Sequence, residues 1–338
     1  MARKKYIKLG LGIVISLTFI WLITRNTDGP AFMQAMRAAD PGWISLGVML
    51  FCAGYVCRIQ RWRVMLNADA AHNITLKKTA VPFLVSIGAN NVLPFRAGDV
   101  MRVFAFSGWL GIGNAYALAT MVVERLLDLL CLLLVFGLGL ILLDRNLGVA
   151  ASRLVGLGAG GVLLIAAGVA FVLLFPGMFK WVALDLLGKI FSPDSKILIQ
   201  TAHFLDTLGK QAQGARMLKL LGLSVLAWCF EGSVFYAAAR AVPAIQEPLA
   251  GLLAFPIATL ATLLPSTPGY VGTFHYFAIQ AAELMGNPVA AATAFAVLVH
   301  MILWLSATLA GGVCALIWVF SDKHMPPFPD TSQINETV

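Results

Sequence analysis

The chain has 338 residues, of which 59% are hydrophobic and only 12% are charged, and its formal net charge is +8. Long uncharged stretches recur from one end to the other, which excludes an ordinary soluble protein and predicts an all-α protein that crosses a membrane several times. No basic domain stands apart from the apolar segments. Cytoplasmic loops that face anionic lipid therefore explain the positive charge better than nucleic-acid binding does.

Six stretches contain the roughly 20 apolar residues that a bilayer-spanning helix requires. The first follows a basic flank of the kind found in signal peptides, but no convincing small-residue cleavage site comes after it, so we interpret it as a retained helix. In chain order the predicted spans cover about 6–24, 42–60, 115–143, 154–176, 217–240 and 289–320.

Two further apolar stretches, 79–110 and 248–285, are each divided near the middle by a proline and glycine loop. The arms of about a dozen residues are too short to cross a bilayer, so both stretches are predicted to form re-entrant helical hairpins. Non-helical backbone at membrane depth is tolerated only inside protein or beside a water-filled cavity. The loop "NNVLPFRAGDVMR" at 90–102 is therefore expected to line a polar cavity.

Lysine and arginine residues are concentrated before the first span, after the second span and in the segment 177–216. By the positive-inside rule these regions face the cytoplasm, and six crossings would place both termini there. Residues 1–320 are expected to form one integral domain in the cytoplasmic (inner) membrane, with 177–216 as an amphipathic cytoplasmic connection. The polar segment 321–338 is expected to be a disordered cytoplasmic tail.

Short matches between the two interrupted stretches indicate an internal repeat. "VLPFRAG" at 92–98 resembles "LLPSTPG" at 263–269, which aligns Pro94 with Pro265, and a Gly-Asn turn follows each loop about twenty residues later. Composition alone could produce such matches, because Ala, Leu and Gly are abundant. The shared order of arm, loop, arm, turn and long helix predicts an inverted repeat, since three crossings separate the two loops.

The long helix after the first loop contains Glu124, Arg125 and Asp128 within two turns. Charged groups inside a membrane are expensive, so these residues are predicted to face the bundle interior and to mark a functional site. Two interpretations stay open. The carboxylates could balance the charges around a bound anionic headgroup, or they could pair with Arg96 or Arg102 and lock the hairpin without touching a ligand.

The candidates for binding a headgroup supply cations, amides and carboxylates. Arg58 and Arg61 stand at the cytoplasmic end of the second span, where simple membrane anchoring would produce the same pattern. The full set is Arg58, Arg61, Asn90, Asn91, Arg96, Asp99, Arg102, Glu124, Arg125 and Asp128.

A second set of candidates lies around the second loop and in the last spans. Glu231 is either a proton-carrying carboxylate or a hydrogen-bonded packing residue. His275 and His300 could titrate near neutral pH, although a lone histidine is more often a hydrogen-bonded core residue. The candidates for the second loop and for coupling are Glu231, Thr267, Tyr270, His275 and His300.

All five cysteines lie inside apolar segments and form no CxxC or Cys/His ligand pattern. They are interpreted as small buried hydrophobic residues, so no disulfide and no metal site is expected, and no motif indicates a cofactor.

Four motifs stand in a fixed order: "CRIQRWRVML" at 57–66, "NNVLPFRAGDVMR" at 90–102, "VVERLLDLL" at 122–130 and "LLPSTPGYVGTFH" at 263–275. Together they resemble the lysylphosphatidylglycerol synthase transmembrane-region family, also described as flippase-like. The resemblance implies a cytoplasmic-membrane protein that moves or handles aminoacylated phospholipids, hopanoid-associated lipids or polyprenyl-linked sugars. The synthases' aminoacyl-transferase domain is absent from this chain, so synthesis of lysyl-lipid is not expected. In addition, His275 stands where the family's second motif carries an acidic residue.

The leading functional hypothesis is a flippase or transporter that moves an anionic or polyprenyl-linked (glyco)lipid, with the two loops as alternating gates. An intramembrane lipid-modifying enzyme is one alternative, but the sequence has no HExxH, GxSxG or paired-aspartate motif, so the chain is expected not to be an enzyme. A non-catalytic membrane partner of a cell-envelope lipid or glycolipid synthase is the other. The expected partners are membrane lipids and such synthases, without nucleic acid, and a homo-oligomer is left open.

Overall fold

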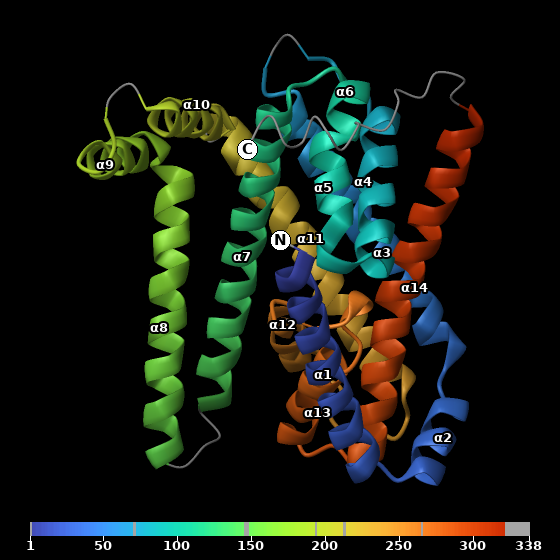
Figure 1. Cartoon of the computed structure of the whole chain (residues 1–338). Coiled ribbons are helices and arrows are strands. Elements are labelled where there is room, and N and C mark those ends of the chain that lie inside the picture. Colours follow the sequence, from blue (N-terminus) through green and yellow to red (C-terminus); the bar gives the residue numbers. More distant parts are fainter. Residues whose placement is uncertain are drawn as a thin grey trace. The chain divides into compact units, whose positions relative to one another are not determined.

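The computed structural model describes residues 2–69, 72–144, 149–192, 195–211, 214–264 and 266–321. Within these ranges every regular element is a helix, and the chain is an all-α, multi-pass membrane protein (Figure 1). Three described helices are both long and apolar enough to cross a bilayer. They are α3 (Pro41–Leu66), α11 (Gly214–Ala241) and α14 (Val289–Ser321).

The other three predicted spans also begin and end within a few residues of helices. They correspond to α1 (Ala2–Asn26), α7 (Asn114–Asp144) and α8 (Val149–Leu174). The 31 residues of α7 are enough to cross a bilayer, and its three clustered charges lie in its first half. The predicted helices are therefore confirmed, and the number of crossings stays a prediction.

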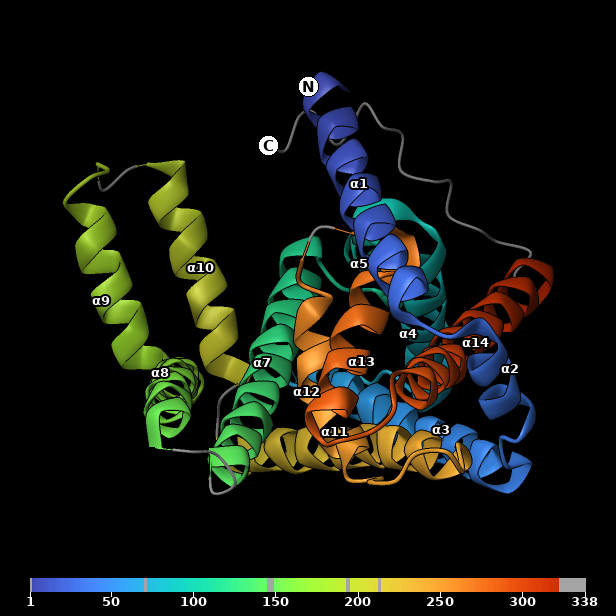
Figure 2. The same cartoon turned by 90° about the horizontal axis from the view of Figure 1, so that it is seen from below.

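The predicted connection 177–216 contains two helices, α9 (Pro176–Gly188) and α10 (Lys196–Gln211). The chain bends by 98° between α8 and α9. Pro176 explains the bend, because proline lacks a backbone donor and disfavours helical backbone in the residue before it. The helices α9 and α10 lie side by side, joined by an ion pair between Lys180 and Asp206 (Figure 2).

One short helix, α2 (Gly29–Arg37), was not predicted in the connection between the first two spans. The Asp28 side chain accepts a hydrogen bond from the backbone amide of Ala31, and a proline stands in the first turn. Both features favour the start of a helix. The predicted tail 321–338 lies, apart from Ser321, outside the described residues.

The chain divides into two compact units, and each is assembled from three separate segments. Unit 1 comprises Met1–Val56, Ile87–Gly98 and Leu226–Val313, and unit 2 comprises Cys57–Ser86, Asp99–Val225 and Cys314–Val338. Because the segments alternate along the sequence, neither unit is a continuous domain. The predicted single domain over 1–320 stays a prediction.

Both interrupted stretches form two helical arms around a proline-led loop. The first comprises α4 (Leu76–Val92), a 3₁₀ turn at Pro94–Arg96, α5 (Ala97–Phe104) and α6 (Phe106–Leu110). The second comprises α12 (Ala250–Ala261), a 3₁₀ turn at Pro268–Tyr270 and α13 (Thr273–Leu284). Within unit 1, α12 packs closely against α13, and α13 also packs against α1.

The two loops share an unusual backbone conformation. Phe95 and Arg96 have φ angles of 61° and 52°, and Gly269 and Tyr270 have φ angles of 74° and 58°. Each loop thus has a proline followed by two left-handed residues, a conformation that is uncommon outside glycine.

The backbone therefore matches Pro94 with Pro268, three positions beyond the match with Pro265 that the sequence predicted. The sequence match rests on residue identity, whereas the equivalent left-handed pairs, Phe-Arg and Gly-Tyr, share no chemistry. Pro265 itself lies outside the described residues. The inverted relation of the two hairpins stays a prediction.

Candidate functional site

The predicted site residues fall into two groups, one in each unit. In unit 2, charged residues form what we call the ion network, which consists of Arg58, Arg61, Asp99, Arg102, Glu124, Arg125 and Asp128. In unit 1, residues of the two loops and of nearby helices surround what we call the loop cavity. The predicted residues that line it are Asn90, Asn91, Arg96, Glu231, Thr267, Tyr270 and His300, and His275 of the same unit contacts His300 without lining the cavity.

Arg102 and Glu124 form a buried bidentate ion pair in the ion network. Nη1 of Arg102 donates to Oε2 of Glu124 at 3.2 Å, and Nη2 donates to Oε1 at 3.0 Å. The two residues are only 1% and 2% exposed. The guanidinium also lies 4.9 Å from the ring centre of Trp62 and 5.2 Å from that of Phe83. This geometry is the internal lock that the sequence left open for Arg102.

A second pair joins α3 to α7 within unit 2. Nη1 of Arg61 donates to Oδ1 of Asp128 at 2.7 Å and to Oγ of Ser224 at 2.9 Å. Arg58 approaches the same carboxylate oxygen at 3.5 Å. Arg61 is fully buried, and its Nε and Nη2 have no hydrogen-bond partner among the described residues.

Arg125 completes the network at its more exposed edge. Its Nη2 donates to both carboxylate oxygens of Asp99 at 3.0 Å, and its side chain is 39% exposed. Over the seven described members, four arginines face three carboxylates. Their formal charges therefore leave the network with one net positive charge, on donors that are largely withdrawn from solvent.

Both proline-led loops line the loop cavity, so the first loop borders a cavity as its polar residues predicted. The larger part has a volume of about 460 Å³, and its polar lining residues are Asn90, Arg96, Thr262, Ser266, Thr267 and Tyr270. An adjoining part of about 140 Å³ shares Thr262, Gly269 and Tyr270 with it. The smaller part is also lined by Asn91, Glu231, His300 and Trp304.

Hydrogen bonds hold both loops to other segments of unit 1. Asn91 Nδ2 donates to the carbonyl oxygen of Trp304 at 3.2 Å and to Oγ1 of Thr308 at 3.0 Å. The backbone amide of Thr267 donates to Oγ of Ser16 at 3.0 Å, and that hydroxyl donates to Oγ1 of Thr267 at 3.1 Å. Asn91 and Thr267 therefore position the loops.

Arg96 connects the two loops without a carboxylate in its described contacts. Its guanidinium carbon lies 6.0 Å from the ring centre of Tyr270, which is the distance of a cation–π contact. Arg96 is half-buried and lines the larger part of the loop cavity. Its environment in unit 1 differs from that of Arg102, although the sequence treated the two arginines alike.

The rings of the two predicted histidines are in contact in a tilted arrangement. Their ring centres are 4.5 Å apart with an interplanar angle of 34°. His300 lines the smaller part of the loop cavity, whereas His275 Nδ1 accepts a hydrogen bond from the backbone amide of Gly272 at 3.4 Å. Among the described residues, no three His, Cys, Asp or Glu side chains are grouped so that they could hold a metal ion.

Sequence reasoning missed three residues that shape these sites. Ser224 accepts a hydrogen bond from Arg61, and Thr262 lines both parts of the loop cavity. Trp304 contacts Asn91 of the first loop through its backbone carbonyl and its indole N–H. A serine inside the apolar stretch of α11 was a detectable polar signal. Nothing in the sequence distinguished Thr262 from its neighbours.

Comparison with known proteins matches residues 9–311 to the family described as the lysylphosphatidylglycerol synthase TM region. Glycosyltransferase AglD of Haloferax volcanii is 24% identical over 336 residues, which covers 90% of this chain and 53% of the relative. The chain thus spans about half the length of this curated relative. Since the family match extends over most of the sequence and includes all four motifs, the chain belongs to the lysylphosphatidylglycerol synthase TM region family.

Proposed function

We propose that the protein is a flippase-type transporter that moves an anionic or polyprenyl-linked (glyco)lipid across the cytoplasmic membrane. One observation carries this proposal. Two proline-led loops, far apart in the sequence, line a common cavity in unit 1. Broken helices around such cavities are how many transporters bind polar substrates at membrane depth, because the interrupted backbone can be satisfied only by protein, water or ligand.

The chemistry of the loop cavity suits a phosphate-bearing headgroup. Arg96 supplies a permanent cation with a planar array of donors, and Tyr270 supports one face of it. Thr262 and Ser266 add hydroxyl groups. Glu231 and His300, which line the smaller part, are the groups that would adjust charge during a transport cycle.

The ion network is proposed to stabilise unit 2 rather than to bind the lipid. Its two most buried arginines, Arg61 and Arg102, already engage carboxylates. Breaking these pairs to bind a lipid phosphate would take the bidentate partner from the buried Glu124 or the shortest ion-pair contact from Asp128. Binding through Arg96 has no such cost among the described contacts.

Family membership supports a function related to membrane lipids, since the family is named after the membrane region of a lipid synthase. The matched relative is named a glycosyltransferase, which favours a second candidate, a non-catalytic membrane partner of a glycolipid synthase. Such a partner would bind lipid in the same cavity but would not move it across the bilayer.

The test is a translocation assay in proteoliposomes with fluorescent phosphatidylglycerol and with a fluorescent polyprenyl phosphate. We expect Arg96→Gln to slow translocation about tenfold or more, the range for a lost charge-assisted hydrogen bond. Arg96→Lys should restore part of the rate, because it keeps the charge without the bidentate geometry. The melting temperature should stay close to that of the wild type in both variants.

Arg37→Gln is the matched control, because Arg37 is an exposed cation of unit 1 that does not line the cavity. Wild-type rates in the Arg96 variants would remove Arg96 from the site. If the wild-type protein retains lipid but does not translocate it, the transporter is rejected in favour of the membrane partner.

A further inference from the structure

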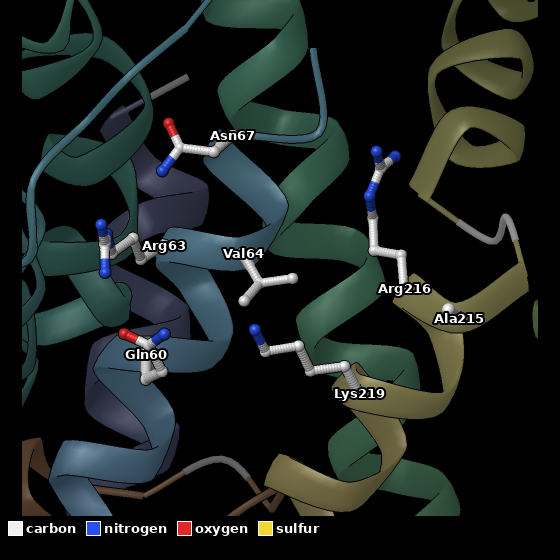
Figure 3. A pocket seen from close by; sticks show the side chains of 7 residues that line it. All are labelled: Gln60, Arg63, Val64, Asn67, Ala215, Arg216 and Lys219. Carbon is white, nitrogen blue, oxygen red and sulfur yellow. The ribbon is translucent and has the colours of Figure 1, made fainter. Parts of the chain in front are cut away.

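A separate cavity of about 430 Å³ lies in unit 2, where α3 ends and α11 begins (Figure 3). Its lining includes three cationic side chains, two amides and no carboxylate. None of these residues belongs to the ion network or the loop cavity. The cavity is lined by Gln60, Arg63, Val64, Asn67, Ala215, Arg216 and Lys219.

The cations of this cavity keep donors available for a ligand. The side chains of Lys219 and Gln60 have no hydrogen bond or ion pair to any other described residue. Figure 3 shows the Lys219 side chain extending from α11 toward Val64 of α3. By contrast, the exposed lysines Lys180 and Lys189 of the same unit each pair with an aspartate. Among the described residues, no ion pair joins Arg63, Arg216 or Lys219 to a carboxylate.

The α3 side of the cavity is fixed in place before any ligand binds. Asn67 Oδ1 accepts from the backbone amide of Ile74 at 2.7 Å, and its Nδ2 donates to the carbonyl of Ile74 at 3.0 Å. Arg63 Nε donates to the same carbonyl at 3.1 Å. In the described contacts this bond uses only the Nε of Arg63, so its two terminal nitrogens stay available. A preorganised donor set of this kind lowers the entropic cost of binding an anion.

The α11 side combines charge with an apolar surface. Nη1 of Arg216 donates to the carbonyl oxygen of Lys210 at 2.6 Å, so the other N–H groups of this guanidinium stay available for a ligand. Leu218, which is next to Lys219 in the sequence, is 73% exposed. An exposed leucine next to unpaired cations on an apolar helix suits a ligand with an anionic headgroup and an acyl chain.

We propose that this cavity binds a phosphate group, and that the group is carried by an anionic phospholipid. Arg63, Arg216 and Lys219 neutralise the phosphate, Gln60 donates to its ester or glycerol oxygens, and the acyl chains lie along the apolar surface of α11. The site goes beyond the proposed transport function, because it lies in unit 2 and none of its residues lines the loop cavity.

The experiment is a lipid titration of the detergent-purified full chain, followed by native mass spectrometry. Phosphatidylglycerol should bind more tightly than phosphatidylcholine, and its affinity should fall as ionic strength rises. Lys219→Gln and Arg216→Gln should each weaken phosphatidylglycerol binding about fivefold, as expected for one basic residue near an anionic lipid. Lys77→Gln, which removes an exposed cation of unit 2 outside the cavity, should leave the affinity unchanged.

Inorganic phosphate as a competitor identifies the source of the phosphate. If phosphatidylglycerol binds, and inorganic phosphate displaces it from the wild type but not from Lys219→Gln, the lipid site is supported. Binding of inorganic phosphate without lipid binding overturns the lipid as the source and keeps the phosphate chemistry. Wild-type affinity in Lys219→Gln and Lys219→Glu overturns the proposal, and these exposed substitutions remain informative even if changes at Arg63 disturb folding. Translocation is measured on the same variants as well. It shows whether the proposed transport through the loop cavity fails independently of lipid binding at this second cavity.

Discussion

At the scale of single residues, the buried pair of Arg102 and Glu124 shows how a charged membrane residue can serve structure. Two parallel hydrogen bonds satisfy the carboxylate, and two aromatic rings cover the guanidinium. Burial removes water from both charges, so each depends on the other for compensation. The loss of one partner should therefore cost more than the net contribution of the pair.

This reasoning gives a prediction for stability. Arg102→Ala should lower the free energy of unfolding by about 3–5 kcal/mol, the range for breaking a buried ion pair. Adding Glu124→Gln should recover part of the loss, because it removes the unpaired charge. Thermal melting of the detergent-purified single and double variants measures this coupling, with Arg37→Ala as the exposed control. Strictly additive effects of the two substitutions would show that the pair does not act as a lock.

The sequence identified the charged residues of the site but not their pairing. Ionisable groups in apolar segments are conspicuous, so all the members of the ion network were predicted. The distinction between Arg96 and Arg102 was not accessible. It arises because Arg102 lies on the helix α5, whereas Arg96 has a left-handed backbone in the loop before that helix. Neither conformation follows from residue type.

At the scale of helices, long apolar runs determine the boundaries, which explains why the six predicted spans coincide with helices. The nine-residue helix α2 was missed because it is too short to contain a long apolar run. Its start depends instead on the hydrogen bond between the Asp28 side chain and the backbone. The backbone match of the two loops was also not accessible from residue identity. Backbone dihedrals, rather than shared letters, relate Pro94 to Pro268.

Close helix contacts give a second prediction. A Cβ atom at Gly251 of α12 would lie 2.5 Å from the carbonyl oxygen of Phe235 in α11, so even alanine must push the helices apart. We expect Gly251→Ala to cost about 1–3 kcal/mol, the usual range for overpacking. Gly222→Ala is the control, since its Cβ would meet no atom within 4 Å. Equal melting temperatures for the two variants would contradict the close approach.

At the scale of the whole molecule, composition was sufficient to predict the protein class, and the charge distribution gave a topology. Composition does not reveal which helices pack against each other, because an apolar helix face can pack against any other apolar face. The two interleaved units, each built from three separate segments, were therefore not predicted.

The topology prediction can be tested by labelling with an impermeant thiol reagent added outside intact cells. In a background without the five native cysteines, a cysteine at Lys78 or Lys189 should resist the reagent. A cysteine at the exposed Ala244 should react, because the connection it lies in carries little positive charge. Reversed labelling would invert the predicted orientation, and equal labelling at all three positions would reject the predicted number of crossings between them.

The division of unit 1 among distant segments has a consequence for how the protein is made. The first loop leaves the ribosome about 200 residues before Trp304 and Thr308, which later accept the hydrogen bonds of Asn91. At synthesis rates of about 5–20 residues per second, the polar loop must wait roughly 10–40 s for these partners. During that interval the insertion machinery, a chaperone or water must satisfy its polar groups. Premature termination before α14 would release a nascent chain whose first hairpin is the part most exposed to membrane quality-control proteases.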